Sequence, residues 1–388
     1  MDNELTPLLM NNLKEFCSDN KNNLVIEYKD GKSSYCRNMS MERRILQNNL
    51  LNYYGFNNNE MNCHIFPSGV CAITCLANIF STGKSMFLTG NELYCDSSRI
   101  CKYISKINKD FTFEKFDVRN SENIINLFKK YNSNINLFFI ESCTNPSGQI
   151  FDFSLLIKLK ELAPNCIFCV DNTWLSGCNF NPFQVSNGII DIVIESMTKY
   201  ISGGLCIGGM MISKPIYMDL ITNYSKSLGL YVSSDHCLIF SKTLKTVESR
   251  ISKMSINSIE LARYLESKKE INRVMHSLLD SHPTNELAKR YLKYSPSVIL
   301  IHINHNHKNK EQIMDIIRSN SYFLAETSYG SSESRIDVFP KYGNSYKYDF
   351  KKKHSVKGIW IRLAVGSDSN LDLLKNGCDE LINKILDN

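Results

Sequence analysis

Apolar residues along this chain alternate between two spacings, one typical of buried strands and the other of amphipathic helices. Short runs rich in β-branched and aromatic residues are separated by segments with helical periodicity. The expected strands lie at Cys63–Pro67, Met86–Gly90, Thr112–Phe116, Ile135–Glu141, Cys166–Val170, Ile192–Ile194 and Gly209–Ile212. The helices expected between them lie at Cys71–Phe80, Ser121–Tyr131 and Ser154–Leu162. This alternation predicts an α/β fold with a mostly parallel sheet covered on both faces.

The pattern changes in the last third of the chain. Residues 214–267 are largely helical, and beyond about Ile251 the expected elements belong to a smaller α+β region. They are one long helix, strands at Ser297–Ile303 and Ile359–Ala364, and helices at Lys310–Ser319 and Asn370–Leu386. Because 388 residues exceed the size that one hydrophobic core supports, we expect two domains. The predicted divisions are an N-terminal arm at 1–62, a large domain at 63–250 and a small domain at 251–388.

Composition narrows the class of protein without identifying it. Apolar residues make up 43% of the chain and charged residues 22%, and the net charge of +6 is dispersed. The densest basic run, Lys351–His354, is short and carries no interleaved aromatic residues, so no nucleic-acid partner is expected. No apolar stretch approaches the roughly eighteen residues that cross a membrane, and no secretory signal is evident. A soluble globular protein is therefore expected.

The fourteen cysteines are irregularly spaced, and many lie within apolar runs. Cys166 and Cys169 form a C-x-x-C pair inside a predicted strand, but no second pair lies at the spacing of a zinc site. Packing of thiols is therefore the better interpretation, and no metal site is expected. Reduced thiols and the lack of a targeting signal predict a cytoplasmic location.

Candidate chemistry is densest directly after the strand at Ile192–Ile194. Ser196, Thr198 and Lys199 follow within a few residues, and a serine and two glycines occupy positions 202–204. Partial burial of a lysine lowers its pKa, and a neutral amine is a nucleophile toward carbonyl groups. Neighbouring hydroxyls and glycine N–H groups can hold a phosphate. The segment therefore suggests a lysine that carries an aldehyde cofactor bearing a phosphate, which is pyridoxal phosphate.

Two other interpretations compete for this segment. Ser196 and Lys199 also match S-x-x-K, the serine-nucleophile signature of β-lactamases and penicillin-binding proteins. That signature requires S-D-N and K-T-G partners, and neither occurs in the chain. A strand that ends in a solvated lysine is the simpler alternative, and four matching residues alone would favour it.

The positions of other polar residues shift the balance toward a cofactor site. Gly69, Asn145, Asp171 and Lys199 each fall just past the carboxyl end of a predicted strand. In parallel sheets, ligands gather at that edge. An aspartate there can pair with a pyridinium nitrogen and keep it protonated, which makes the ring an electron sink. An aspartate that caps a turn is the common alternative, and the joint presence of Asp171 and Lys199 favours the functional role.

Weaker signals lie elsewhere in the chain. Tyr35 and Arg37 can together clamp a phosphate, although surface residues are the default interpretation of such a pair. The small-residue turn at Ser68–Val70 opens a helix whose N-terminal N–H groups can face an anion. Tyr94 can stack on a cofactor ring, and Arg362 can hold a substrate carboxylate or form a structural ion pair.

Taken together, these segments resemble, in order, the motifs of the Cys/Met-metabolism family of pyridoxal-phosphate enzymes. That family includes cystathionine γ-synthase, γ-lyase, β-lyase and methionine γ-lyase. The resemblance covers roughly residue 35 to the C-terminus. The matching segments are Tyr35-Cys36-Arg37 (Y-S-R), Ser68-Gly69-Val70 (S-G-M), Thr144-Asn145-Pro146 (T-N-P), Asp171-Asn172-Thr173-Trp174 (D-N-T-F), Ser196 to Tyr200 (S-x-T-K-Y) and Arg362 to Gly366 (R-L-S-V-G).

The resemblance implies an aspartate-aminotransferase-like (fold type I) architecture, with a large seven-stranded, mostly parallel sheet domain and a smaller C-terminal α+β domain. It also implies site residues. Lys199 and Tyr94 would be catalytic, and Arg362, Ser328 and Asn145 would bind the substrate. The cofactor would be held by Lys199, Asp171, Thr173, Ser196, Thr198, Gly69, Val70 and Tyr94, with Tyr35 and Arg37 donated by a partner subunit. A homotetramer built from two such dimers is expected.

Two segments depart from the family pattern. The G-G-H after the lysine becomes Gly203-Gly204-Leu205, and S-L-G-G-V-E-S becomes Ser328 to Ser334. The residue before Ser328, where γ-synthases usually carry Glu and β-lyases Tyr, is Thr327. Because threonine supplies neither charge nor bulk, we expect a γ-substituted substrate with a small tail, such as an O-acylhomoserine, to be handled better than cystathionine.

The resemblance therefore predicts γ-replacement or γ-elimination on a homoserine-derived or cystathionine-type substrate, as in trans-sulfuration and sulfur amino-acid biosynthesis. The alternatives are β-lyase or methionine γ-lyase activity, or a non-catalytic homologue that binds the cofactor. A serine acylase that uses Ser196 is a distant third.

Overall fold

A computed structural model of the chain describes residues 40–56, 60–304, 308–339 and 358–387. The chain divides into two compact units, residues 1–41 and 42–388, and the fold described below is that of the second unit. None of the helices in the described ranges is long and apolar enough to cross a membrane.

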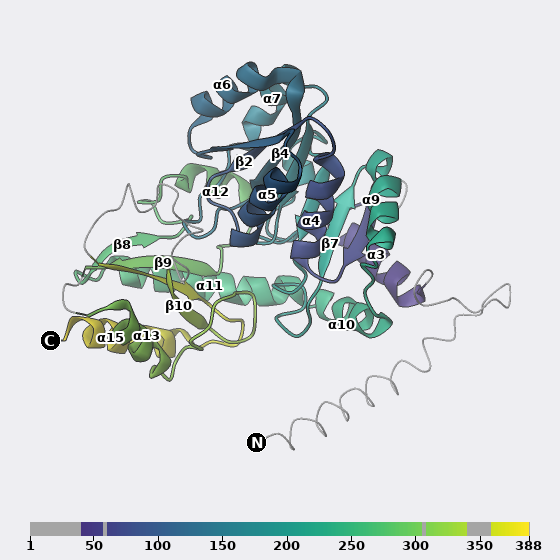
Figure 1. Cartoon of the computed structure of the whole chain (residues 1–388). Helices are drawn as coiled ribbons and strands as arrows, with labels where there is room; N and C mark the ends of the chain where they lie inside the picture. Colours follow the sequence, from purple (N-terminus) through teal and green to yellow (C-terminus); the bar gives the residue numbers. More distant parts are fainter. Residues whose placement is uncertain (1–39, 57–59, 305–307, 340–357, 388) are drawn as a thin grey trace. The chain divides into compact units, whose positions relative to one another are not determined.

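A seven-stranded sheet forms the centre of the larger region (Figure 1). Its strands, given in chain order, are β1 (Asn62–Phe66), β2 (Ser85–Gly90), β3 (Phe111–Phe116), β4 (Ile135–Glu141), β5 (Ile167–Asp171), β6 (Ile192–Glu195) and β7 (Gly209–Ser213). Their order across the sheet is β1-β7-β6-β5-β4-β2-β3, and β7 runs antiparallel to both of its neighbours. The other six strands therefore share one direction, and their carboxyl ends lie along one edge.

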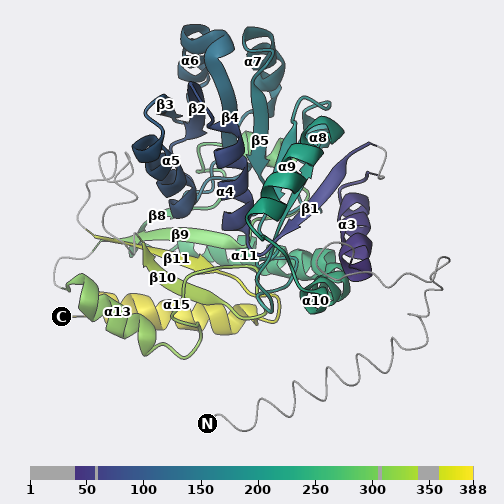
Figure 2. The same cartoon turned by 45° about the vertical axis from the view of Figure 1, so that its right-hand side comes forward.

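Helices cover both faces of this sheet. Figure 2 shows α4, α5 and α9, whose apolar side chains pack against one face. Helices α3, α6 and α7 contribute to the core on the other face. The helices of this region are α3 (Met41–Tyr53), α4 (Gly69–Phe80), α5 (Cys95–Ile107), α6 (Ser121–Tyr131), α7 (Leu156–Leu162), α8 (Pro182–Val185), α9 (Pro215–Ser227) and α10 (Ser234–Leu244). Short 3₁₀ turns lie at Asn132–Asn134 and Phe153–Leu155.

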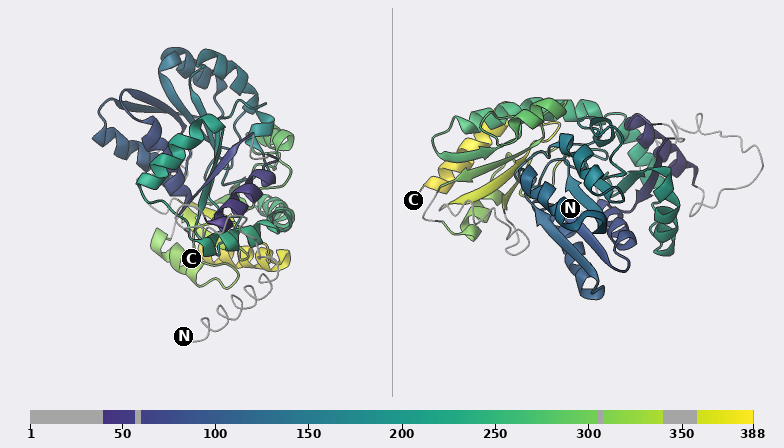
Figure 3. Two further views of the ribbon diagram at one scale, coloured as in Figure 1. Left: turned by 90° about the vertical axis from the view of Figure 1, so that its right-hand side faces the viewer. Right: turned by 90° about the horizontal axis from the view of Figure 1, so that it is seen from above.

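A second, antiparallel sheet follows, with strand order β10-β11-β9-β8. It belongs to the green-to-yellow part of the ribbon in Figure 3. Its strands are β8 (Ile271–Met275), β9 (Val298–Ile303), β10 (Arg335–Phe339) and β11 (Ile359–Ala364), and the helices are α11 (Val247–Glu266), α12 (Asn285–Tyr291), α13 (Lys310–Arg318) and α15 (Leu371–Leu386). Helices α11, α13 and α15 pack on one face, together with Ile361 and Leu363 of β11. Because side chains alternate along a strand, Arg362 projects from the opposite face.

Local sequence explains several of these elements. All residues of β5 and β6 are buried, as their continuous apolar character predicts for central strands. Helix α4 begins where the Ser68 hydroxyl accepts the Cys71 N–H at 3.1 Å. Helix α13 begins with a capping box between Asn309 and Gln312.

The expected α/β architecture is confirmed, including the mostly parallel seven-stranded sheet and the separate C-terminal sheet. Asp171 is the last residue of β5 rather than the first residue beyond it. Helices α5 and α12 and strands β8 and β10 were not expected from the sequence, although the apolar residues of α5 do recur at helical spacing. The division expected at residue 250 lies within α11, and α3, placed in the N-terminal arm, contributes buried Leu46 and Leu50 to the large core.

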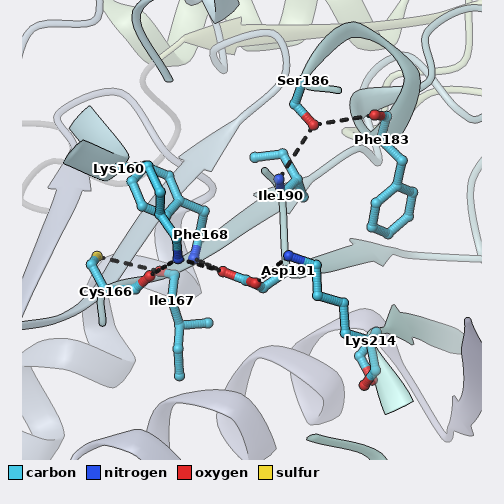
Figure 4. Close-up of polar contacts among 10 residues, drawn as sticks. Lys160, Cys166, Ile167, Phe168, Phe183, Ser186, Ile190, Asp191 and Lys214 are labelled. Carbon is cyan, nitrogen blue, oxygen red and sulfur yellow. Dashed lines mark hydrogen bonds and ion pairs between the residues drawn. The ribbon is translucent and has the colours of Figure 1, made fainter. Parts of the chain in front are cut away.

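At the amino edge of the large sheet, a buried aspartate joins three elements (Figure 4). Asp191 precedes β6, and its carboxylate lies 2.7 Å from Lys214 Nζ and 3.5 Å from Lys160 Nζ. It also accepts the Phe168 N–H at 2.9 Å. The Asp191 carboxylate therefore connects helix α7, strand β5 and the end of β7 through these three contacts.

Candidate active site

All the described candidate residues line one cavity of about 460 Å³ at the carboxyl edge of the large sheet. They come from loops and strand ends of the large region and from β11 and the loop before β10. The candidate residues that line it are Gly69, Val70, Tyr94, Asn145, Asp171, Thr173, Ser196, Thr198, Lys199, Ser328 and Arg362. Tyr35 and Arg37 lie outside the described residues.

One end of the cavity is built from the start of α4 and the loop after β6. A Cβ atom on Gly69 would lie 2.7 Å from Ser196 Cβ, so only glycine allows this approach. N–H groups in the first turn of a helix, such as those of Gly69 and Val70, have no intrahelical acceptor. The Ser196 hydroxyl has no hydrogen-bond partner among the residues that the structure describes. This end of the cavity therefore offers donors that suit an anion.

Thr198 and Thr173 are more constrained than the sequence indicates. The Thr198 hydroxyl donates to the Gly208 carbonyl at 3.2 Å and accepts the Gly208 N–H at 3.0 Å. Its proton is thus engaged in closing the loop. The Thr173 hydroxyl accepts the Ser196 N–H at 2.8 Å, which fixes the start of the same loop.

Lys199 lies inside the cavity rather than on the surface. Its Nζ donates to Ser328 Oγ at 2.7 Å and lies 5.3 Å from the centre of the Tyr329 ring. Burial, followed by the positive charges of Arg362 and Arg335, lowers the pKa of Lys199 to about 8. No carboxylate among the described residues forms an ion pair with it. A substantial fraction of the amine is therefore neutral near pH 8, as nucleophilic attack requires.

Asp171 is buried at the end of β5, where its Oδ1 accepts the Thr173 N–H at 2.9 Å. Burial raises the pKa of Asp171, and the hydrogen bonds from Thr173 oppose that rise. In the part of the chain that the structure describes, no cation pairs with this carboxylate. A positively charged ring nitrogen would supply the missing charge.

The small sheet supplies the opposite wall. Arg362 is only 8% exposed, and its guanidinium donates to Asn145 Oδ1 at 3.3 Å and to Thr327 Oγ1 at 2.5 Å. Ser328, next to Thr327, has a positive φ of 106°, which is an uncommon and strained conformation for a residue with a side chain. The loop at 327–328 thus connects the Arg362 guanidinium with the Lys199 amine.

Tyr94 forms another part of the wall at the start of α5, and its side chain is partly exposed. Its N–H donates to Glu141 Oε1. Burial raises the pKa of the Tyr94 phenol above its ordinary value, so the phenol keeps its proton at neutral pH.

A model of the Cys/Met metabolism PLP-dependent enzymes matches residues 11–377. The chain belongs to this family. The chain is therefore a pyridoxal-phosphate-dependent enzyme of Cys/Met metabolism, and the expected cofactor is confirmed. The residues present fit that cofactor, because the cavity combines an anion-binding end, a lysine with a lowered pKa and a buried aspartate without a described counter-charge.

Known family members are similar along most of their length. Cystathionine β-lyase of Lactococcus lactis subsp. cremoris is 25% identical, over 80% of this chain and 79% of its own. Cystathionine γ-lyase of Rattus norvegicus is 26% identical, over 81% of this chain and 77% of its own. L-methionine γ-lyase of Fusobacterium nucleatum subsp. polymorphum is 25% identical, over 79% and 76%.

Solved structures show the same fold. Cystathionine γ-lyase of Lactobacillus plantarum, complexed with L-serine, aligns with a TM-score of 0.80 at 19% identity and covers 93% of this chain and 91% of its own. Cystathionine γ-synthase of Xanthomonas oryzae pv. oryzae, in complex with cystathionine, aligns with a TM-score of 0.78 at 22% identity. The alignment covers 91% of this chain and 88% of the synthase chain. The expected fold-type-I architecture of this enzyme is therefore confirmed.

The cavity of this enzyme also contains residues that the sequence analysis missed. Glu141 ends β4, Trp174 follows Thr173, and Tyr329 follows Ser328; the ring centroids of Trp174 and Tyr329 lie 5.1 Å apart. Near Tyr94, Asp96 and Arg99 form an ion pair of 2.7 Å at the cavity wall. Glu141 carried a usable signal, because it is the last residue of an apolar strand, like Asp171 in the neighbouring strand.

Proposed function

We propose that this enzyme catalyses γ-replacement or γ-elimination on a homoserine-derived or cystathionine-type amino acid. The observation that carries the proposal is the pairing of Lys199 and Arg362 across one cavity. An amine with a pKa near 8 lies opposite a guanidinium that suits a carboxylate, and an α-amino acid presents its reacting carbon next to such a carboxylate. The names of the relatives, which include lyases for cystathionine and for methionine, support this substrate class.

The proposed roles follow from the contacts of each residue. Bound pyridoxal phosphate supplies an electron sink that makes the protons of the substrate carbon chain acidic. Lys199 would bind the cofactor aldehyde and, as a free amine, would move protons at Cα and at the next carbon of the substrate. Asp171 holds the proton of the ring nitrogen. Ser196 and the N–H groups of Gly69 and Val70 hold the phosphate.

The remaining residues orient the reactants. Arg362, with Asn145, binds the substrate carboxylate, and Ser328 holds the Lys199 amine at 2.7 Å. Tyr94 would pack on the cofactor ring and assist proton transfer. Thr173 and Thr198 act mainly through the loop that they hold, because their hydroxyls contact backbone groups at 2.8 Å and 3.2 Å.

The phosphate site is proposed to be completed by Tyr35 and Arg37 of a second subunit, in a dimer that pairs again into a tetramer. An apolar surface near the cavity supports a subunit contact, because Leu205 is 75% exposed and Ile207, which lines the cavity, is 62% exposed. Mixing Arg37→Ala with Lys199→Ala subunits tests the arrangement. Activity should recover in hybrid sites that contain both an intact Arg37 and an intact Lys199. A lack of recovery would mean that Arg37 serves the site of its own subunit.

We also propose a cytoplasmic location. None of the twelve described cysteines forms a disulfide, which suits a reducing compartment.

A substrate screen tests the reaction. Purified holoenzyme is offered O-acylhomoserines, cystathionine, cysteine and methionine, while ammonia, keto acids and thiol adducts are measured. Lys199→Ala is the control for background. We expect turnover of a γ-substituted amino acid, with an O-acylhomoserine preferred. Turnover of cysteine or cystathionine by β-elimination alone would replace the proposal with β-lyase activity, and spectral shifts without product would indicate a non-catalytic homologue.

A further inference from the structure

Glu141 occupies an unusual place in the cavity wall. It ends β4, its side chain is only 6% exposed, and it lines the cavity. Its carboxyl group accepts the N–H of Tyr94, which precedes α5, and the N–H of Asn145, in the turn after β4, lies near enough to favour the charged form of the same carboxyl group. One buried carboxyl group therefore holds two backbone segments that carry proposed site residues.

A second glutamate strengthens the same connection. Glu92, two residues before Tyr94, accepts the Thr144 hydroxyl at 3.1 Å and also the Ser147 hydroxyl. Thr144 and Ser147 flank Asn145 in the turn. The loop that carries Tyr94 and the turn that carries Asn145 are thus joined by side chains on both sides.

The far side of the turn is held as well. His282 lies 2.9 Å from the Ser147 carbonyl oxygen, and the Ser277 hydroxyl donates to the Gly148 carbonyl at 2.6 Å. The turn is therefore anchored to the small region on one side, and Glu141 fixes its position relative to Tyr94 on the other.

Packing alone does not account for a glutamate at this position. Glu141 lies directly opposite Asp171 in the β4–β5 pair, and directly opposed side chains project to the same face of a sheet. Burial, together with the negative charge of Asp171, raises the pKa of Glu141 well above its ordinary value. Because like charges in a buried site are unfavourable, an apolar residue would stabilise this edge better. The contacts with the two backbone N–H groups explain why a carboxyl group occupies this position.

We propose that Glu141 is a positioning residue, whose carboxyl group fixes Tyr94 and Asn145 relative to each other. The cofactor ring beside Tyr94 and the substrate carboxylate held by Arg362 and Asn145 then keep one mutual orientation. The inference rests on the proposed function of the cavity. It predicts that Glu141 acts on ligand geometry through two backbone N–H groups and without touching the reacting atoms.

Variants of Glu141 test this role against a matched glutamate. Glu195 also ends a strand at the same edge and is fully buried, but its carboxylate accepts hydrogen bonds from Tyr54 and Ser176 instead. We expect Glu141→Ala to raise KM about tenfold and lower kcat about tenfold, because both ligands lose their alignment. Added formate, which can occupy the vacated position, should restore part of both parameters, whereas chloride at equal ionic strength should not.

A binding measurement separates this proposal from the proposed reaction. The probe is 4-hydroxybutyrate, which presents a carboxylate but has no amine to react with the cofactor. By ligand-detected NMR, its affinity for the holoenzyme should fall about tenfold in Glu141→Ala and stay within about threefold of wild type in Glu141→Gln, which keeps one acceptor oxygen. Glu195→Ala should lower stability while affinity, KM and kcat per folded holoenzyme stay near wild type.

Two outcomes would overturn the proposal. One is a Glu141→Ala enzyme that loses stability as Glu195→Ala does but keeps its KM, kcat and probe affinity. If Glu141→Ala does not fold, Glu141→Asp replaces it, since it keeps the carboxyl group and withdraws the oxygens from both N–H groups. The second outcome that would overturn the proposal is unchanged kinetics in Glu141→Asp. A wild-type protein that binds the probe but turns over no amino acid would refute the proposed reaction, while the binding comparison would still decide the role of Glu141.

Discussion

The charged side chains at the two edges of the seven-stranded sheet differ in whether they are paired within the chain. At the amino edge, Asp191 is 3% exposed and lies within ion-pair distance of Lys214 and Lys160 (Figure 4). At the carboxyl edge, Asp171 is buried and Lys199 is partly buried, yet neither forms an ion pair with any described residue. Their partners are the Thr173 N–H and the Ser328 hydroxyl.

We propose that the paired charges of the amino edge stabilise the fold and that the unpaired charges of the carboxyl edge bind a ligand. A buried charge is unfavourable unless it is paired, so the amino edge completes its pairing within the chain. The carboxyl edge keeps an acid with a raised pKa and an amine with a lowered pKa in one cavity. A ligand that supplies the missing charges binds the folded state alone and therefore stabilises it.

The substitution with the largest expected effect removes the Lys199 amine at the carboxyl edge. Lys199→Ala should lower turnover by about 10³-fold or more, because both the attachment point and the proton carrier are lost. In wild type, borohydride reduction followed by peptide mapping should place a pyridoxyl group on Lys199. Lys214→Ala is the matched control, and it should keep that label. A label on any other lysine would refute the assignment.

Next in size is the loss of the guanidinium at the same edge. Arg362→Ala should raise KM for an amino-acid substrate by the equivalent of about 1.5–3 kcal/mol, since a charge-assisted contact with the carboxylate is removed. Arg362→Lys keeps the charge but loses the two-pronged geometry, so it should recover only part of the loss. Steady-state kinetics measure both variants, and an unchanged KM would place the carboxylate elsewhere.

At the amino edge, a substitution should affect stability alone. Asp191→Asn removes the charge that Lys214 and Lys160 share, and we expect a loss of about 1–3 kcal/mol in the free energy of unfolding. The loss should be moderate because the two lysine side chains are 34% and 30% exposed. Urea unfolding measures the stability, and kcat/KM of the folded enzyme should stay at the wild-type value. A large fall in kcat/KM would show that the two edges are coupled.

Placing a carboxylate beside Arg362 makes the carboxyl edge more like the amino edge. Thr327 Oγ1 lies 2.5 Å from Arg362, so Thr327→Glu should raise KM for every amino-acid substrate through competition for the guanidinium. The same carboxylate favours a distal ammonium, so cystathionine should gain about threefold to tenfold relative to an O-acylhomoserine, as for one charged contact of about 1 kcal/mol. The ratio of the two kcat/KM values is the measurement, and an unchanged ratio would remove residue 327 from substrate discrimination.

The smallest effect concerns pH. Because the pKa of Lys199 is lowered from 10.5 to about 8, the neutral amine increases as pH rises through that value. Capture of pyridoxal phosphate by the apoprotein, followed by visible absorbance, should therefore accelerate with a midpoint near pH 8. Between pH 8 and 10.5 the unfolded chain binds a proton that the folded chain does not, so this residue makes stability rise with pH across that window. A midpoint near 10.5 would mean that the amine is solvated.

Much of the fold and of the site follows from local sequence. Strands β4 and β6 and helix α6 follow from their apolar spacing, because periodicity decides which face of an element is buried. The rule that ligands gather at strand ends is sufficient to bring Asp171 and Lys199 together. Helix α5 was missed although its apolar residues recur at helical spacing, and strand β10 was missed because two of its five residues are charged.

Other features depend on how successive strands are arranged in the sheet. The Thr198 hydroxyl lines the cavity but donates its proton to Gly208, and the reversal of β7 that brings Gly208 there leaves no local trace. The ion pair of Asp191 with Lys214 depends on the same reversal, because the residue after β7 must return to the start of β6.

The sequence by itself determined the layered α/β architecture and the family, and it supplied the candidate site residues, because spacing and strand ends are properties of short segments. Only the tertiary structure decided how those residues are tuned. The pKa of Lys199 depends on burial and on Arg362, which lies 163 residues away in the chain. The hydrogen bond between Glu141 and the Tyr94 N–H depends on strand order, because β4 must lie next to β2 in the sheet. Both effects arise from desolvation and from distances between side chains, and these exist only once the two sheets have packed around the cavity.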